Sequence, residues 1–263
     1  MRISKSAKIV LGSISSFIMV IIYTPLAIVV INSFNTSINM DWPPPGFTFS
    51  WWQKAFGSNG LIAALGTSVA IALAASLIAI VLGTLLAIGL SRYKFFGKES
   101  VGLMVILPIA LPGIVTGLAL NNAFRTVLGM QLSMATVIVA HATFCIVTVY
   151  NNVLARLSRV NRNLEDASAD LGAGVFTTFR LVTLPQIRSA LVAGGLLAFA
   201  LSFDEIIVTT FTAGAGVETL PIWILNNMFR PGKAPVVDVV AVTTILLSLV
   251  PLYFAQRLTR EEK

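Results

Sequence analysis

The chain has 263 residues, of which 56% are hydrophobic and only 11% charged. Because a soluble domain carries about 25% charged residues, this composition excludes a soluble enzyme and a disordered chain. A disulfide scaffold is excluded as well, since the sequence holds a single cysteine. The composition therefore indicates an integral membrane protein.

Long uncharged stretches predict where the chain crosses the membrane. A helix needs about 20 mainly apolar residues to span the hydrocarbon, and continuous apolar runs favour helices over the alternating strands of a barrel. We predict an all-α polytopic membrane protein with six transmembrane helices, forming one membrane domain over residues 1–263. The predicted spans are 9–33, 62–90, 101–124, 133–155, 189–212 and 236–256.

The first predicted span follows a basic N-terminus, as the apolar region of a signal peptide does. Its uncharged stretch covers residues 9–40, whereas the apolar region of a signal peptide has about 7–15 residues. We therefore expect an uncleaved first helix.

The basic residues predict the orientation of the chain. Of the 18 lysines and arginines, 14 fall on one side of the predicted spans. They lie before the first span, after the second, between the fourth and fifth, and after the sixth. The positive-inside rule then places this side and both termini in the cytoplasm. The net charge of +7 thus has a topological origin and does not indicate nucleic-acid binding.

The longest outer loop, 34–60, is rich in proline and tryptophan. It contains Pro43, Pro44 and Pro45 and then Trp51 and Trp52. Because tryptophan favours the membrane–water interface, we interpret the segment as an anchored interfacial loop. A docking surface for an external partner is the alternative interpretation.

The longest cytoplasmic loop, 156–188, is predicted to be ordered. The pattern indicates a short helix, a break and a second short amphipathic helix. Asn163 can cap the first helix, with Asp166 three residues on completing a capping box. Gly172 suits the position after that helix, because glycine accepts a positive φ, and Pro185 is expected to stop the second helix. Such an ordered loop indicates that another protein docks on it.

The pattern of this loop resembles the EAA loop of ABC importer permeases, in which an acidic-Ala-Ala triplet precedes a glycine and a Leu-Pro pair. Here Asp166-Ala167-Ser168 matches the triplet, with Gly172 and Leu184-Pro185 following. We refer to residues 156–188 as the EAA segment. Within this superfamily the chain resembles the spermidine/putrescine-type permeases. That resemblance is carried by 107–115, His141 with Phe144, 201–205 and Thr209-Thr210-Phe211.

The resemblance implies a type I ABC importer permease in the cell inner membrane, transporting a small cationic solute, most simply a polyamine. It implies a coupling helix that docks into a cytoplasmic ATP-binding subunit, with acidic residues capping or pairing with basic groups there. The residues assigned to coupling are Glu165, Asp166, Ala167, Ser168, Gly172, Ala173, Leu184 and Pro185.

The same resemblance implies the partners of the chain. These are a dimer of ATP-binding subunits, a second permease subunit, an external substrate-binding protein and membrane lipid. ATP and Mg²⁺ would be bound by the ATPase, because this chain has no Gly-x-x-x-x-Gly-Lys-Ser/Thr motif. We expect no cofactor or metal in this chain and no enzymatic activity of its own.

Two features predict a translocation path. Asp204 and Glu205 lie within the fifth predicted span, where a charge costs at least about 2.5–3.5 kcal/mol unless it faces a polar cavity. Paired acids would attract a polycation, although one could instead pair with a partner permease or both could reach the outer interface. Pro108 and Pro112 would kink the third span and expose carbonyl oxygens.

His141 and Cys145 lie one helical turn apart. Because two ligands are too few for a metal and no catalytic partner is evident, a hydrogen bond between helices is the favoured role for His141. Gly194-Gly195 is expected to allow close helix packing.

Three other functions remain open from the sequence. An ABC permease for an opine or a phosphonate belongs to the same broad class. A secondary transporter with Asp204 or Glu205 as proton carrier is disfavoured by the ordered EAA segment. A channel is disfavoured because the chain shows no filter-like repeat.

Overall fold

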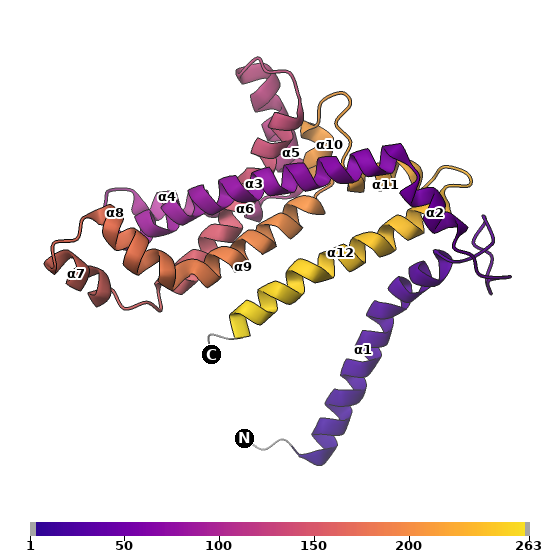
Figure 1. Cartoon of the computed structure of the whole chain (residues 1–263), viewed down its shortest axis with the longest axis horizontal. Coiled ribbons are helices and arrows are strands. Elements are labelled where there is room, and N and C mark those ends of the chain that lie inside the picture. The colour runs from indigo at the N-terminus through magenta and orange to yellow at the C-terminus, as the bar shows by residue number, and fades with distance from the viewer. Residues whose placement is uncertain (1–3, 261–263) are drawn as a thin grey trace. The chain divides into compact units, whose positions relative to one another are not determined.

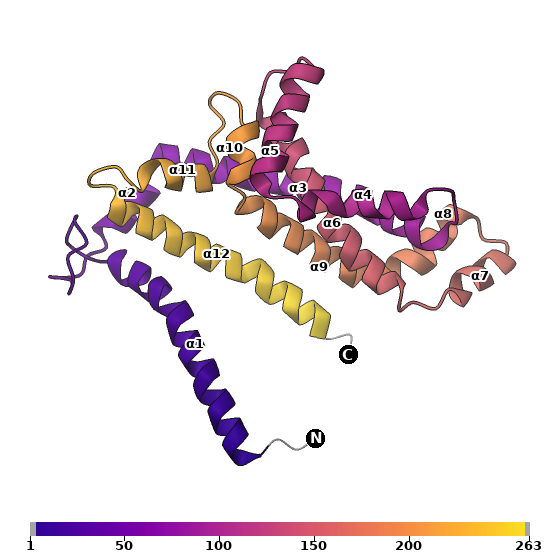
Figure 2. The ribbon, with the colours of Figure 1, turned by 180° about the vertical axis from the view of Figure 1, so that it is seen from behind.

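The computed structural model describes residues 4–260, and for residues 6, 250–252 and 254–260 it describes the backbone alone. In this range the secondary structure is helical apart from one isolated β-bridge between Asn35 and Phe47 (Figures 1 and 2). Contacts divide the chain into two compact units. Unit 1 holds the described residues up to Ile62 and Ile224–Leu246, and unit 2 holds Ala63–Trp223 and the described residues from Leu247 onward.

The helices follow one another along the chain, and the longest connection, residues 33–49, lies between the first two. Their bounds are α1 Lys5–Asn32, α2 Ser50–Phe56, α3 Asn59–Arg92, α4 Lys98–Ala110, α5 Gly113–Asn122, the π-helix η1 Ala123–Val127, α6 Met134–Leu157, α7 Asn163–Asp170, α8 Val175–Thr178, the π-helix η2 Phe179–Thr183, α9 Leu184–Phe203, α10 Ile207–Thr212, α11 Leu220–Asn227 and α12 Ala234–Arg260.

Unit 1 contains the predicted outer loop, which folds around Asn35. This side chain donates to the carbonyl oxygen of Asp41 at 3.0 Å, and the indole N–H of Trp51 donates to the carbonyl oxygen of Asn35 at 2.8 Å. Trp51 is therefore only 6% exposed, in the interior of the loop. Trp42 remains largely exposed, so it can serve the interfacial role that the sequence suggested for the tryptophans.

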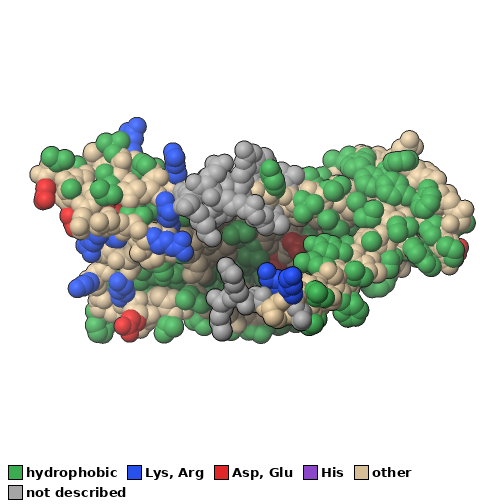
Figure 3. Space-filling view, turned by 90° about the horizontal axis from the view of Figure 1, so that it is seen from below, with side chains coloured by type: hydrophobic (Ala, Val, Ile, Leu, Met, Phe, Trp, Pro, Cys, Tyr) green, Lys and Arg blue, Asp and Glu red, His purple; other side chains and the backbone are tan. Residues whose placement is uncertain are grey.

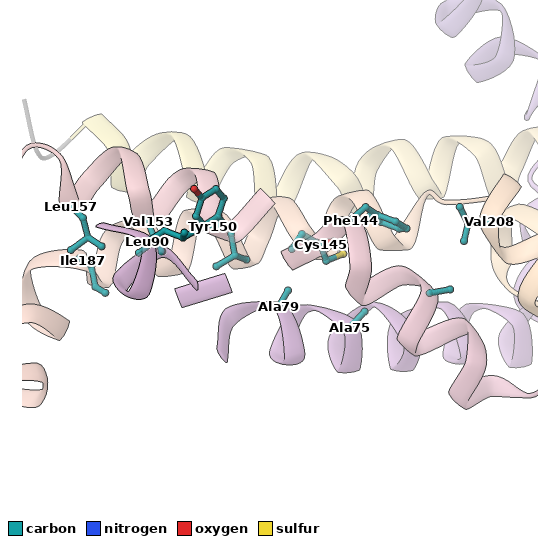
Figure 4. Close-up of a cluster of buried hydrophobic side chains, with 14 of the residues drawn as sticks. Ala75, Ala79, Leu90, Phe144, Cys145, Tyr150, Val153, Leu157, Ile187 and Val208 are labelled. Carbon is teal, nitrogen blue, oxygen red and sulfur yellow. Dashed lines mark hydrogen bonds between the residues drawn. The ribbon is translucent and has the colours of Figure 1, made fainter. Parts of the chain in front are cut away.

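Unit 2 has its core where α3, α6 and α9 pack together (Figure 4). The predicted close packing at Gly194-Gly195 is confirmed. A β-carbon at Gly194 would lie 3.3 Å from Cα of Val149 on α6, and one at Gly195 would lie 2.8 Å from Cδ1 of Ile80 on α3. Small residues thus let the backbones approach, as in other helix contacts within membranes. The core includes Ala75, Ala79, Cys145, Val149, Val153, Leu157, Ile187 and Ala198.

The six predicted spans are reproduced only in part. Among the described residues, four helices are long and apolar enough to cross a membrane, namely Ala7–Asn32, Asn59–Arg92, Met134–Leu157 and Val175–Phe203. The pair Lys98–Ala110 and Gly113–Val127 makes a fifth if it is counted as one broken span, since its halves are bent by 108°. The apolar part of α12, Ala234–Leu249, is shorter.

Two predicted spans are interrupted for local reasons. The third breaks at Leu111, which adopts an extended conformation (φ −83°, ψ 144°) before Pro112. A residue that precedes proline disfavours the helical region, because the proline ring clashes with its backbone. The fifth ends as a helix at Phe203, ahead of what we call the α9–α10 break, residues 204–206.

Candidate functional site

The first half of the EAA segment folds as the short helix α7, with a start that differs from the prediction. Asn163 is the first helical residue and does not cap the helix with its side chain. Its backbone N–H instead donates to Oδ1 of Asn161 at 3.0 Å. The predicted capping box of Asn163 and Asp166 is therefore wrong. Asparagine side chains commonly bind a backbone N–H two residues ahead, and Asn161 lies in the position to do so.

The end of α7 agrees with the prediction. Gly172 has a φ of +82°, which an L side chain adopts only with strain. The N–H of Ala173 donates to the carbonyl oxygen of Ser168 at 3.1 Å, and that of Gly172 donates to Ala169 at 2.9 Å. These two bonds form a Schellman motif, which satisfies the last carbonyls of the helix and reverses the chain.

The second half of the EAA segment is continuous with the next long helix. Residues Val175–Phe203 form one helical run, in which the π-helix Phe179–Thr183 precedes Leu184 and Pro185 at the start of α9. The prediction that Pro185 stops a separate helix is wrong. A proline clashes with the regular turn before it, and here that turn has the wider π-helical form.

Glu165 connects α7 to the rest of unit 2. Its carboxylate forms an ion pair with Arg92 at the end of α3, with Nε 2.9 Å from Oε2, and Nη2 donates to Oε1 at 3.0 Å. The hydroxyl of Thr183 also donates to Oε1 at 3.0 Å. The Arg92 and Glu165 side chains are 14% and 16% exposed. The resemblance implies that Glu165 pairs with a partner subunit, whereas here it pairs within its own chain. Arg92 could be found from the sequence only as a basic residue at the end of a long apolar helix.

The other residues of the EAA segment leave an exposed surface. Asp166 and Ala167 are exposed, and Leu171 and Phe176 are 88% and 74% exposed. An open cavity of about 290 Å³ lies between α7 and the end of α3. Figure 3 shows Lys and Arg side chains gathered at the end of unit 2 that carries α7 and α8. Exposed basic residues of this end are Lys94, Arg159, Arg162, Arg180 and Arg188.

The second group of predicted residues lies at the α9–α10 break. Asp204 caps the C-terminus of α9 and is exposed, and Glu205 is half-buried. Oε1 of Glu205 accepts the backbone N–H of Val208 at 2.8 Å. The expectation that both acids lie within a continuous helix is therefore wrong. The break supplies a free backbone N–H for the Glu205 carboxylate, whereas a continuous helix would use that N–H in its own ladder and leave a charge in the membrane without a partner.

The two interrupted spans meet at their breaks. A β-carbon at Gly113, the first residue of α5, would lie 3.7 Å from Ile207, the first residue of α10. Further along, Gly117 lies against the ring of Phe211, and the side-chain amide of Asn121 donates to the carbonyl oxygen of Phe211. Since Pro112 caps α5, the fold brings it next to the break that holds the acids.

Pro108 lies one turn earlier, within α4. The predicted path residues therefore fall at the two breaks or within one turn of them.

His141 makes the predicted contact between helices. Its Nδ1 lies 2.8 Å from Oγ of Ser202 on α9, and its Nε2 lies 2.9 Å from Oγ1 of Thr209 on α10. One turn along α6, the thiol of Cys145 donates to the carbonyl oxygen of Ala198 at 3.3 Å. Both residues thus join α6 to the neighbouring helices.

The fold is that of ABC importer permeases. The chain superposes with a TM-score of 0.77 and 14% identity on a chain of a bacterial ABC transporter involved in the import of alginate, covering 98% of this chain and 99% of that one. The family of binding-protein-dependent transport system inner membrane components matches residues 79–262. The chain belongs to this family, and it is a transport permease of the inner membrane and not an enzyme.

Two relatives define the branch of the family. The chain is 35% identical to the spermidine/putrescine transport system permease protein PotC of Haemophilus influenzae, over 91% of this chain and 92% of the relative. It is 34% identical to the putrescine transport system permease protein PotI of Escherichia coli, over 87% of this chain and 82% of the relative.

Proposed function

We propose that the chain is the membrane-spanning subunit of an ATP-driven importer for polyamines, with putrescine and spermidine as substrates. The observation that carries the proposal is the identity of 34–35%, over about nine-tenths of the chain, to permeases named for these solutes. The acids of the α9–α10 break support it, because Asp204 is exposed and Glu205 half-buried. Two carboxylates favour a polycation over a neutral or anionic solute.

In the membrane, residues 1–263 form a single permease domain with six crossings and both termini in the cytoplasm. The helices α4 and α5 together form one broken crossing, and α12 forms the last. The exposed basic residues around α7 support this orientation, because basic residues concentrate on the cytoplasmic side. The breaks of the third and fifth crossings then meet inside the bilayer and provide the polar site.

On the cytoplasmic side, α7 docks onto one subunit of an ATPase dimer, which binds the ATP and Mg²⁺. The exposed Asp166 and Ala167 and the apolar side chains of Leu171 and Phe176 provide the docking surface. Glu165 and Ser168 hold α7 against Thr183 and Thr178. Gly172 and Ala173 turn the chain after α7, and Leu184 and Pro185 begin α9. A second permease subunit and an external binding protein complete the complex.

The test is ATP-driven uptake of putrescine and spermidine by proteoliposomes that contain the complete complex and its binding protein. Asp204→Asn and Glu205→Gln are expected to lower uptake, whereas the matched control Glu99→Gln, at an exposed acid near the start of α4, is expected to leave it unchanged. If a binding protein loaded with another solute stimulates ATP hydrolysis and polyamines are not taken up, the substrate is an opine or a phosphonate instead. Uptake driven by a proton gradient without ATP would overturn the proposal.

A further inference from the structure

His141 lies at a buried junction of α6, α9 and α10. Its side chain is 1% exposed, and Ser202 and Thr209 are buried with it. Ser202 belongs to the last turn of α9, and Thr209 belongs to the first turn of α10. One imidazole ring therefore bridges the α9–α10 break from side to side, with a hydrogen bond from each ring nitrogen.

The direction of these hydrogen bonds follows from Thr209. Its hydroxyl donates to the backbone carbonyl oxygen of Glu205 at 2.9 Å, so its oxygen is left to accept from Nε2–H of His141. A neutral imidazole with its proton on Nε2 has an acceptor at Nδ1, which takes the hydroxyl proton of Ser202. One chain of hydrogen bonds thus runs from Ser202 through His141 and Thr209 to the backbone of Glu205.

We propose that His141 is a positioning residue for translocation, which fixes the turn of the α9–α10 break and so the direction in which Asp204 and Glu205 face. The proposal rests on the proposed function, in which these acids line the substrate path. It assigns neither metal binding nor proton transfer to the histidine, because both ring nitrogens are engaged with hydroxyl groups. A buried hydrogen-bond network in which every member is satisfied holds one conformation in this way.

Removing one hydroxyl tests the link between the ring and Glu205. Thr209→Val keeps the shape of the side chain but leaves Nε2–H and the Glu205 carbonyl oxygen without their partner. The matched control is Thr210→Val, at the next residue of α10, whose exposed hydroxyl donates only to its own helix, at the carbonyl oxygen of Ile206. In the proteoliposome assay we expect Thr209→Val to lower the maximal rate of spermidine uptake on the order of tenfold.

The same preparations separate a positioning role from a loss of folding. ATP hydrolysis stimulated by the binding protein, and the yield of assembled complex, should match wild type for Thr209→Val and for Thr210→Val. If uptake, ATP hydrolysis and yield fall in parallel, the hydrogen-bond network stabilises the fold and does not position the acids. Equal uptake by the two variants would overturn the inference.

Two replacements of the histidine sharpen the test. The side-chain amide of His141→Gln reaches the position of Nε2 and can still donate to Thr209, whereas that of His141→Asn reaches only the position of Nδ1 and can serve Ser202. Because the link to Glu205 runs through Thr209, His141→Gln should retain severalfold more uptake than His141→Asn. The opposite order would contradict the proposed path of hydrogen bonds.

Thiol labelling distinguishes failure of this inference from failure of the proposed function. In a Cys145→Ala background, Asp204→Cys introduces a thiol whose reaction rate with a cationic thiol reagent reports how the break faces the solvent. Adding His141→Asn should change that rate severalfold and leave the rate at a control thiol, Glu99→Cys, unchanged. A changed labelling rate, together with a wild-type complex that does not transport polyamines, would keep the positioning role and discard the substrate. An unchanged rate at position 204 would overturn the positioning role.

Discussion

The EAA segment and the α9–α10 break are both held in place by one polar junction, but the two junctions differ in kind. Around α7, the junction is an ion pair of Arg92 with Glu165, assisted by one hydroxyl and partly exposed to solvent. At the break, it is the neutral ring of His141 between two buried hydroxyls. A charged pair is tolerated where water remains nearby, whereas a junction deep between helices needs neutral groups that satisfy one another.

This difference has a mechanical consequence. Hydrogen bonds among buried neutral groups are not screened by salt and hold one geometry, which suits a site that must present carboxylates in a fixed direction. The helix α7 instead exposes most of its side chains, and the side-chain hydrogen bonds that hold it to its neighbours run from Glu165 to Arg92 and Thr183 and between Ser168 and Thr178. That arrangement suits an element that moves together with a docked partner.

The largest effect is expected at the turn after α7. Gly172→Val places a β-branched side chain at a φ of +82°, which strains the backbone because the left-handed region is closed to such residues. Uptake should fall by about 10- to 100-fold. The matched control Gly174→Val has an extended backbone, with φ −70° and ψ 164°. Open space surrounds the β-carbon at both positions, so equal losses in the two variants would show that the left-handed turn is not what matters.

A charge exchange tests whether the ion pair connects α7 to α3. Arg92→Glu places two carboxylates together and should lower uptake per ATP hydrolysed by about tenfold, and Glu165→Arg should do the same. The double variant restores opposite charges and should recover part of the loss. Lys94→Glu changes an exposed charge nearby and is expected to have no effect. Losses that simply add in the double variant would contradict a direct pair.

A smaller effect is expected where the two interrupted helices meet. A β-carbon at Gly117 would lie 2.8 Å from Cδ2 of Phe211, so Gly117→Ala should displace α5 from α10 and destabilise the complex by about 1–3 kcal/mol. Gly113→Ala, one turn earlier on the same face, makes only an ordinary contact at 3.7 Å. The Tm of the purified complex should fall for Gly117→Ala and not for Gly113→Ala, and similar Tm values would mean that α5 is free to shift.

The smallest expected difference between the two junctions lies in how uptake per ATP hydrolysed responds to salt. Raising the ionic strength from about 0.1 M to 1 M shortens the screening length from about 10 Å to 3 Å. In Glu165→Gln, which has no ion pair to screen, uptake per ATP hydrolysed should respond less to salt than in wild type. In Thr209→Val the response should equal that of wild type, because the junction of His141 carries no charge. A salt response unaffected by Glu165→Gln would show that the ion pair does not contribute to coupling.

Local patterns in the sequence predicted several elements correctly. The uncharged runs located α1, α3 and α6, the turn after α7 was expected at Gly172, and the pairing of His141 with another helix was foreseen without its partners. Each of these depends on residues within a few turns, where composition, glycine conformation and helix periodicity act directly. The start of α7 was misplaced because Asn161 and Asn163 have the same capping chemistry and compete over two residues.

What the sequence determined by itself is that the chain is a helical membrane protein with an ordered EAA segment, because hydrophobicity and glycine turns act through neighbouring residues. The tertiary structure decided which polar groups meet. Arg92 finds Glu165 across 73 residues, and His141 finds Thr209 across 68. It also brought the breaks before α5 and α10 together, moving Asp204 and Glu205 from an expected helix to a turn. Such pairings depend on how helices pack, and no local periodicity records which distant residue will lie opposite.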